Sequence, residues 1–248
     1  MHKIDEKLAD VTARLQAAAA AASRPDGDIT LIAVSKTQSP ERVREAYSAG
    51  LRRFGENYLQ EALDKQHALA DLAGIEWHFI GPIQSNKTRA IAEHFSWVHS
   101  VDRLKIAERL SAQRPQHLPP LNICLQVNID REPSKAGVHL AELPALARAV
   151  AALPGLSLRG LMAIPAPASE PEAQRQPFNQ LAEALKQLKP LGLAAPLDTL
   201  SMGMSADLEA AVECGATMVR IGTDLFGPRQ SKATSATNTT ATTTKDNP

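Results

Sequence analysis

The sequence is poor in cysteine and in aromatic residues. Only two cysteines occur, Cys124 and Cys214, and aromatic residues make up 4% of the chain. Neither cysteine belongs to the short Cys/His spacing that a structural zinc site requires. We therefore expect both to be buried thiols, and we expect no metal.

The chain also lacks an excess of either charge, since Lys plus Arg and Asp plus Glu number 27 each. This balance favours a small ligand over nucleic acid or an anionic membrane surface as the main partner. Near the N-terminus, Asp5, Glu6 and Asp10 interrupt apolar residues at helical spacing. That pattern predicts a helix and neither a signal peptide nor a membrane span, so we expect a cytoplasmic protein.

What the sequence does contain is a repeated alternation of short apolar runs with amphipathic segments. The runs are 29–36, 52–57, 76–81, 97–101, 122–129, 158–164, 197–203 and 218–223. Repeated strand-then-helix units imply parallel strands, and eight such units close a barrel. We predict an α/β protein: a single (β/α)8 TIM barrel over residues 1–229, with an extra N-terminal helix.

Residues typical of helix starts and helix ends support this prediction. Segments 39–50 and 205–216 each begin with Ser, carry acidic residues in the first turn and close near Gly. A doubly wound open sheet is the alternative, but it would require a Gly-rich phosphate loop after the first strand, where segment 35–41 (SKTQSPE) stands. Residues 230–248 contain almost no large apolar residue, which predicts a disordered tail.

Lys36 is the first candidate functional residue, because active sites of parallel barrels lie at the carboxyl ends of the strands. It terminates an otherwise uncharged run. Desolvation there would favour the neutral amine, which is the form that attacks an aldehyde. The alternative is a strand-end lysine whose ammonium reaches water, and position alone leaves both interpretations open.

The last two units carry small residues where each strand gives way to a helix, in LSMGMS (200–205) and VRIGT (219–223). Barrels commonly bind phosphate after their seventh and eighth strands, through backbone N–H groups at helix starts. A lysine early in the chain and a phosphate site late in it fit pyridoxal 5′-phosphate (PLP). Ordinary turn and capping chemistry would also explain Ser201, Gly203 and Ser205.

Three further residues are candidates for contact with the cofactor. Arg220 lies inside an apolar run and would need a buried partner, such as a pyridine nitrogen or a phosphate. Asn57 and His78 would line the ring or its O3′ edge. A lone strand histidine is equally compatible with a hydrogen-bonded core residue.

Seven strings together resemble the pyridoxal phosphate homeostasis protein family, also called YggS/PROSC. The resemblance runs from about Asp28 to Gly227, with the motifs in the family's order and spacing. The strings are AVSKTQ, FGENYLQE, EWHFIGPIQSNK, LQVNIDREPSKAG, LRGLMAIPAP, LSMGMSADLEAA and MVRIGTDLFG.

The resemblance implies a fold similar to the barrel domain of alanine racemase and a Schiff base between PLP and Lys36. It also implies that Arg220 faces the pyridine nitrogen, and that Lys87 and Lys135 occupy positions where PLP could bind transiently during loading or release. The phosphate contacts that it implies are Ser201, Ser205, Gly222 and Thr223, and the remaining cofactor contacts are Asn57, Gly203, Met162 and His78.

The family is regarded as PLP-binding without an established activity, and the residues agree with a carrier. A racemase needs a second acid/base opposite its lysine, whereas Tyr47 is expected mid-helix in the outer layer and Tyr58 at a helix start. A cation at the pyridine nitrogen would also weaken the electron sink of the ring. We therefore expect PLP storage and transfer, with apo PLP-dependent enzymes as possible recipients, by a monomer.

Two alternatives remain at this point. One is a PLP-dependent racemase or decarboxylase. The other is a barrel for a different phosphorylated metabolite, in which Lys36 is only an electrostatic partner.

Overall fold

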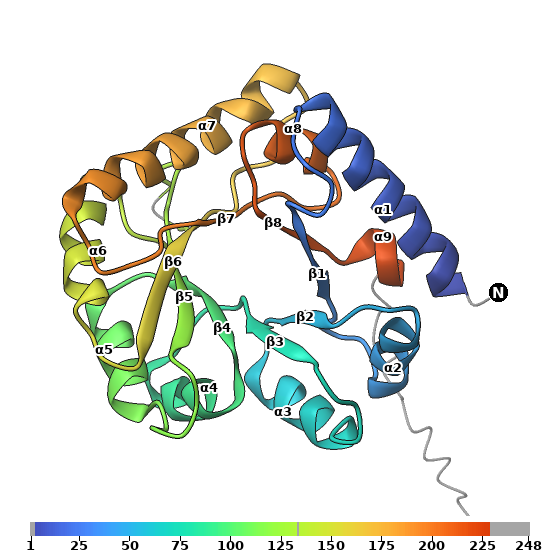
Figure 1. Ribbon diagram of the computed structural model, residues 1–248, viewed down its shortest axis with the longest axis horizontal. Helices are drawn as coiled ribbons and strands as arrows, with labels where there is room; N and C mark the ends of the chain where they lie inside the picture. Colours follow the sequence, from blue (N-terminus) through green and yellow to red (C-terminus); the bar gives the residue numbers. More distant parts are fainter. Residues whose placement is uncertain (1–2, 133, 229–248) are drawn as a thin grey trace, which may run out of the picture.

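A computed structural model describes residues 3–132 and 134–228, and within them the chain forms a closed barrel of eight parallel strands (Figure 1). The strands follow one another around the barrel in sequence order, and β8 pairs with β1 to close it. The predicted (β/α)8 architecture is confirmed. The tail predicted to be disordered, 230–248, lies outside the described residues.

Each predicted apolar run overlaps one strand, although β5 and β6 begin before their predicted runs. The strands are β1 (Thr30–Val34), β2 (Arg53–Glu56), β3 (Glu76–Phe79), β4 (Trp97–Val101), β5 (Leu121–Gln126), β6 (Leu156–Met162), β7 (Thr199–Ser201) and β8 (Met218–Ile221). Because side chains alternate between the two faces of a strand, every second residue points into the barrel. A small inner cluster of Ile32, Trp97, Cys124, Met162 and Met218 fills part of that interior.

The helices form an outer layer around the strands (Figure 1). They are α1 (Lys3–Ala21), α2 (Pro40–Ser48), α3 (Leu59–Ala68), α4 (Thr88–His94), α5 (Leu104–Gln113), α6 (Leu143–Ala151), α7 (Pro171–Leu188), α8 (Leu208–Glu213) and α9 (Thr223–Phe226), with short 3-10 turns η1 (Ser85–Lys87) and η2 (Lys189–Leu191). The expected N-terminal helix is α1, which packs against α8 and α9. The larger apolar core lies between this layer and the barrel.

Local signals set most helix boundaries, with one exception. Helix α2 begins as predicted, with Pro40 in its first turn and the Ser39 hydroxyl accepting a hydrogen bond from the Arg42 N–H at 3.4 Å. Helix α8 begins later than segment 205–216 predicted, because residues 205–207 form a turn in which the Asp207 carboxylate accepts from the Met204 N–H at 2.6 Å. The interpretation of Ser205 as the N-cap of that helix is therefore wrong.

The two cysteines are buried and form no disulfide, as expected. Close packing between strands also requires glycine at one point of the barrel wall, because a Cβ at Gly160 of β6 would lie 1.8 Å from the Thr199 carbonyl oxygen of β7. Among the described residues no helix combines the length and the apolar character needed to cross a bilayer.

Candidate functional site

The carboxyl ends of β8, β1 and β2 bring together residues far apart in the sequence. Lys36 follows β1, Asn57 directly follows β2, and Gly222 directly follows β8. A Cβ at Gly222 would lie 3.3 Å from the carbonyl oxygen of Val34, the last residue of β1. The loops that carry Lys36 and Gly222 are therefore in contact at one mouth of the barrel.

The loop around Lys36 is held by a buried ammonium. The Lys65 side chain is 2% exposed, and its Nζ donates to the Ser35 carbonyl at 2.6 Å and to the carboxylates of Glu56 and Glu61 at 2.8 and 2.6 Å. The Glu61 carboxylate also accepts from the Thr37 N–H at 2.5 Å. Both neighbours of Lys36 are thereby fixed from one point.

Two features of this cluster are strained. Thr37 has a φ of +64°, a left-handed conformation that persists in a non-glycine residue only when its surroundings impose it. Burial raises the pKa of Glu56 against the opposing effect of Lys65, and its Oε2 has no hydrogen-bond partner. The loop of Lys36 is therefore held by a cluster that includes a strained residue and a buried carboxylate oxygen without a hydrogen bond.

Arg220 lies inside the barrel with 4% exposure. Its guanidinium donates to the Ser201 hydroxyl at 2.7 Å and to the Ala163 carbonyl at 3.0 Å, and no carboxylate of the described residues forms an ion pair with it. Burial lowers the pKa of Arg220 to about 10, with the Asp207 carboxylate opposing the shift. A buried cation held only by neutral acceptors suits a ligand with an aromatic nitrogen or a negative charge.

Close packing beside the mouth requires glycine at position 203. Gly203 has a φ of +92°, and a Cβ there would lie 2.5 Å from the Cβ of Ala211. Its carbonyl accepts a hydrogen bond from the Arg220 N–H at 3.0 Å. The Oδ1 atom of Asn57 is buried and has no hydrogen-bond partner. Together with the amine of Lys36, this unsatisfied polar atom and the strand-end backbone fit a phosphorylated aromatic aldehyde.

Ser201 and His78 belong to a continuous chain of hydrogen bonds through the interior. Ser201 Oγ is 2.7 Å from His99 Nδ1, His99 Nε2 is 2.9 Å from His78 Nδ1, and His78 Nε2 is 3.0 Å from Glu76 Oε1. Both ring nitrogens of His78 are occupied, which agrees with the alternative of a hydrogen-bonded core histidine. His99 was not singled out from the sequence, because WVHSV is typical of an ordinary buried strand.

Of the other predicted residues, Met162 is fully buried at the end of β6, where it pairs with Ser201. Ser205 is half-buried in the turn after β7, and Thr223 is exposed at the start of α9. All of these lie toward the mouth that holds Lys36. No group of three or more potential metal ligands occurs in the described part of the chain.

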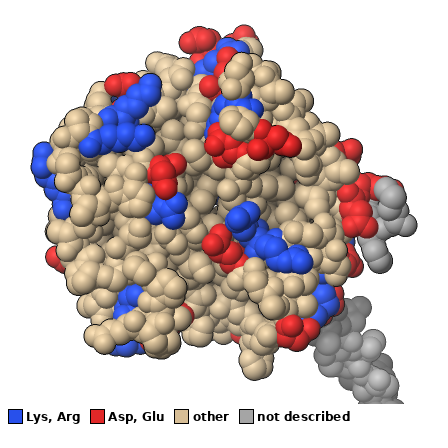
Figure 2. Space-filling model, in the orientation of Figure 1, with Lys and Arg blue, Asp and Glu red and all other residues tan. Residues whose placement is uncertain are grey.

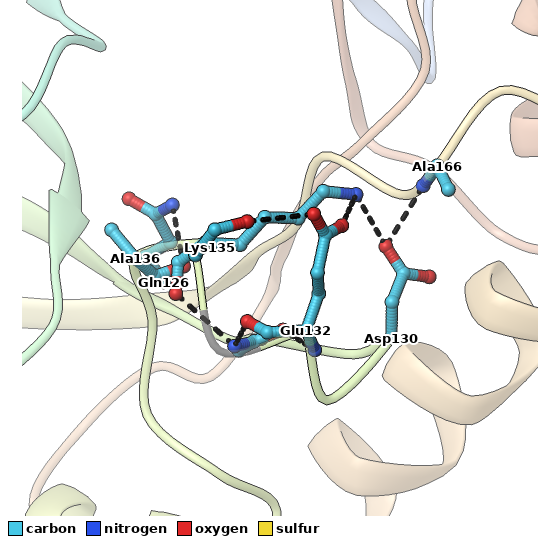
Figure 3. A network of polar contacts seen from close by, with 8 residues as sticks. Gln126, Asp130, Glu132, Lys135, Ala136 and Ala166 are labelled. Atoms are coloured by element: carbon cyan, nitrogen blue, oxygen red, sulfur yellow. Dashed lines mark hydrogen bonds and ion pairs between the residues drawn. The ribbon is translucent and has the colours of Figure 1, made fainter.

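Lys87 and Lys135 lie on other loops. Lys87 is exposed in η1, after β3. Lys135 lies after β5, where Figure 3 shows its ammonium between two carboxylates, Asp130 at 2.7 Å and Glu132 at 3.3 Å. Asp130 also accepts from the Ala166 N–H at 2.8 Å, which ties this loop to the one after β6.

Arg14 of α1 ties together the loops that follow β7 and β8. Its guanidinium donates to the Ser205 carbonyl at 3.0 Å, to the Glu209 carboxylate at 2.9 Å and to the Asp224 carboxylate at 2.7 Å. Ser205 and Asp224 adjoin predicted phosphate contacts. No local sequence pattern signals this contact, since Arg14 lies about 200 positions from its partners.

The surface near the mouth is hollowed and mixed in charge. A cavity of about 550 Å³ is lined by Lys7, Thr37, Arg42 and residues 226–228, beside the loop of Lys36. Figure 2 shows basic and acidic side chains interspersed on the face in view, with no large patch of one sign. This agrees with the expectation of a small ligand.

Comparison with known proteins gives consistent matches along the chain. Residues 7–230 match the family model of the alanine racemase N-terminal domain. The pyridoxal phosphate homeostasis protein of Pseudomonas aeruginosa is 63% identical over 229 residues, covering 92% of this chain and 97% of that one. The protein of the same name from Escherichia coli K12 is 54% identical over 231 residues, covering 92% and 98%.

Solved structures agree with the fold. PipY of Synechococcus elongatus, in a structure with PLP bound, superposes with a TM-score of 0.81 at 39% identity, covering 91% of this chain and all of that one (100%). Alanine racemase from Corynebacterium glutamicum superposes with a TM-score of 0.67 at 19% identity, covering 90% of this chain and 62% of that one, which shows a shared fold alone.

The buried histidines predict a specific dependence of stability on pH. Burial lowers the pKa of His78, and lowers the pKa of His99 well below its ordinary value, so both stay neutral in the folded chain. Below the unfolded pKa of about 6.5 the unfolded chain binds protons that the folded chain does not. We expect the free energy of unfolding to be retained above this pH and to fall as the pH drops below it, by at most about 1.4 kcal/mol per pH unit for each histidine.

Urea denaturation between pH 7 and pH 5 measures this slope. The variant His99→Asn should lose stability less steeply with falling pH than the wild type, whatever its absolute stability. Replacement of the exposed His117 by Asn is the control and should leave the slope unchanged. Equal slopes for the wild type and His99→Asn would contradict the neutral buried state.

Proposed function

Because this chain belongs to the alanine racemase N-terminal domain family and, within it, to the pyridoxal phosphate homeostasis proteins, we propose that it binds PLP and serves intracellular PLP homeostasis, with the cofactor held as a Schiff base on Lys36. The observation that carries the proposal is the contact between the loops of β1 and β8. It packs the end of β1, two residues before Lys36, against Gly222, which follows the strand that carries the buried Arg220.

Different residues at the mouth would bind different parts of PLP. Gly203 and Gly222, with Ser205 and Thr223 nearby, would hold the phosphate through backbone N–H and hydroxyl groups. Arg220 would face the pyridine nitrogen, and Asn57 would lie along the O3′ edge of the ring. Bound PLP supplies an aldehyde for a lysine amine and an electron sink for carbanions.

The site would also depend on three residues inside the barrel, Ser201, Met162 and His78. Ser201 is itself a predicted phosphate contact, and its hydroxyl accepts a hydrogen bond from the Arg220 guanidinium, so it would also hold the cation in position. Met162 pairs with it across β6 and β7. His78 acts at one remove, through His99.

We propose a carrier of PLP in preference to an enzyme. A racemase or decarboxylase would need an electron sink, and the cation of Arg220 opposes protonation of the pyridine nitrogen. Neither tyrosine offers a second base at the mouth: the Tyr47 hydroxyl donates to the Ala73 carbonyl in the outer layer, and Tyr58 precedes α3 with 56% exposure. Transfer to apo PLP-dependent enzymes, by a cytoplasmic monomer, completes the proposal.

The Schiff base is tested by absorbance and peptide mapping. Incubation with PLP should give a visible absorption band, and borohydride should convert it to a pyridoxyl adduct on the peptide containing Lys36. Lys36→Ala should show neither, whereas Lys186→Ala, which removes an exposed lysine of α7, should behave as the wild type. A wild-type protein that stays colourless and unmodified would instead favour a barrel for another phosphorylated metabolite.

The contribution of α1 is tested separately. Arg14→Ala should weaken PLP binding several-fold, because the loops after β7 and β8 lose their common partner. The matched control is Arg24→Ala, since Arg24 lies just after α1 and donates to the Val212 and Ala216 carbonyls, away from the mouth. Equal losses of affinity in a fluorescence titration of the two variants would show a general effect of loosening α1.

Carrier and enzyme are distinguished by exchange of the amino acid α-proton. The PLP-loaded protein, mixed with L-alanine in D2O, should incorporate deuterium at Cα no faster than the same concentration of free PLP. Mass spectrometry measures the incorporation. Exchange well above the free cofactor would support the racemase alternative.

A further inference from the structure

The hydrogen-bond chain through the barrel connects its two ends. Glu76 begins β3, so its carboxylate lies at the amino end of the strands, where it also meets Arg53 at 3.3 Å. Ser201 ends β7 and contacts Arg220 at the carboxyl end. His78 and His99, both fully buried, are the links between them.

Each proton in this chain has one consistent position. The Glu76 carboxylate is ionised, since its hydrogen bond with His78 lowers its pKa, and it can only accept. His78 Nε2 must therefore carry the hydrogen, and because the ring is neutral its Nδ1 is an acceptor. The same logic places the hydrogen of His99 on Nε2 and leaves Nδ1 to accept from the Ser201 hydroxyl.

The orientation of the Ser201 hydroxyl follows from this sequence of donors. With its hydrogen directed at His99, its remaining lone pairs face Arg220, whose Nη1 is 2.7 Å away. If the chain ran in the opposite direction, His78 Nε2 would present a lone pair to a carboxylate at 3.0 Å, which is repulsive. One charge at the amino end thus selects the direction of the three hydrogen bonds that lead from Glu76 to Ser201.

We propose that Glu76, His78 and His99 are positioning residues that act through Ser201 to hold Arg220 toward the cofactor. The inference rests on the proposed function, because it concerns the residue that would face the pyridine nitrogen. Glu76 touches neither the cofactor nor the mouth in this account. Its effect passes only through the direction of the hydrogen bonds.

The other groups around the chain do not replace this role. Trp97 stacks on His78 with ring centroids 5.6 Å apart and offers no acceptor to it, and the Cys124 thiol is held protonated because burial raises its pKa to about 12. Another carboxylate at the amino end of the strands, Asp198, precedes β7 and is not part of this chain. It is engaged by Arg159 at 2.8 Å and by the Thr199 hydroxyl at 2.8 Å.

The test is Glu76→Gln, with Asp198→Asn as the matched control. Both remove one carboxylate from the amino end of the barrel and preserve the shape of the side chain, but only Glu76, which is half-buried, belongs to the chain, whereas Asp198 is exposed and lies outside it. Because a glutamine can rotate to donate, it no longer enforces a hydrogen on His78 Nε2. The first readout is ¹⁵N NMR of the histidine rings without PLP, and the second is the PLP dissociation constant.

In the wild type and Asp198→Asn, both buried histidines should give the Nε2–H tautomer. In Glu76→Gln the Nδ1 signals should move toward the protonated position, and PLP binding should weaken about fivefold, the size expected for one lost hydrogen bond. Unchanged tautomers, an unchanged dissociation constant, or equal effects of the two variants would overturn the proposal. Absence of PLP binding by the wild type would refute the proposed function, while the tautomers would still report the direction of the chain.

Discussion

The polar interior of this barrel is organised around the buried guanidinium of Arg220. An arginine cannot lose its proton on burial as a lysine or histidine does, so its charge must be accommodated by neighbours. Here those neighbours are the Ser201 hydroxyl and the Ala163 carbonyl, both neutral. The charge of Arg220 is therefore not neutralised by the protein, and a bound anionic or nitrogen-containing ligand would stabilise it.

A second charge network holds the loop of Lys36 in a different way. Lys65 is paired with two carboxylates and fixes the backbone on either side of Lys36. Removal of one partner from such a buried pair leaves an uncompensated charge, which is strongly destabilising. One network therefore holds the backbone of the Lys36 loop, and the other holds the Arg220 guanidinium on the neighbouring strand β8.

The sequence predicted the barrel and the members of the mouth, because both follow from local patterns. Apolar runs alternating with helical segments indicate parallel strands, and strand order then brings Lys36, Gly203 and Gly222 to one end. Long-range partners carry no such signal. His99 lies 102 residues from Ser201, and Arg14 lies 210 residues from Asp224, so only the closed barrel shows that they meet.

Errors of detail also have physical causes. Ser205 has the residue type and spacing of a helix cap, but the carboxylate of Asp207 binds the Met204 N–H and the helix begins later. Competition between nearby polar groups decided this case, and sequence spacing does not rank such competitors. The contact of His78 with the cofactor stays a prediction, although β3 continues one residue beyond His78 and both of its ring nitrogens are bonded within the core.

The closure of the barrel has a consequence for how the molecule is made. Strand β1 pairs with β8, and Arg14 reaches loops near the other end of the chain. Such contacts of high sequence separation form slowly and late. During synthesis, the first two hundred residues can form their helices and strands. The barrel cannot close beside β1 until β8 has left the ribosome. Until then the nascent chain has Lys36 without the neighbouring strand that carries Arg220, so the mouth is complete only after β8 has been synthesised.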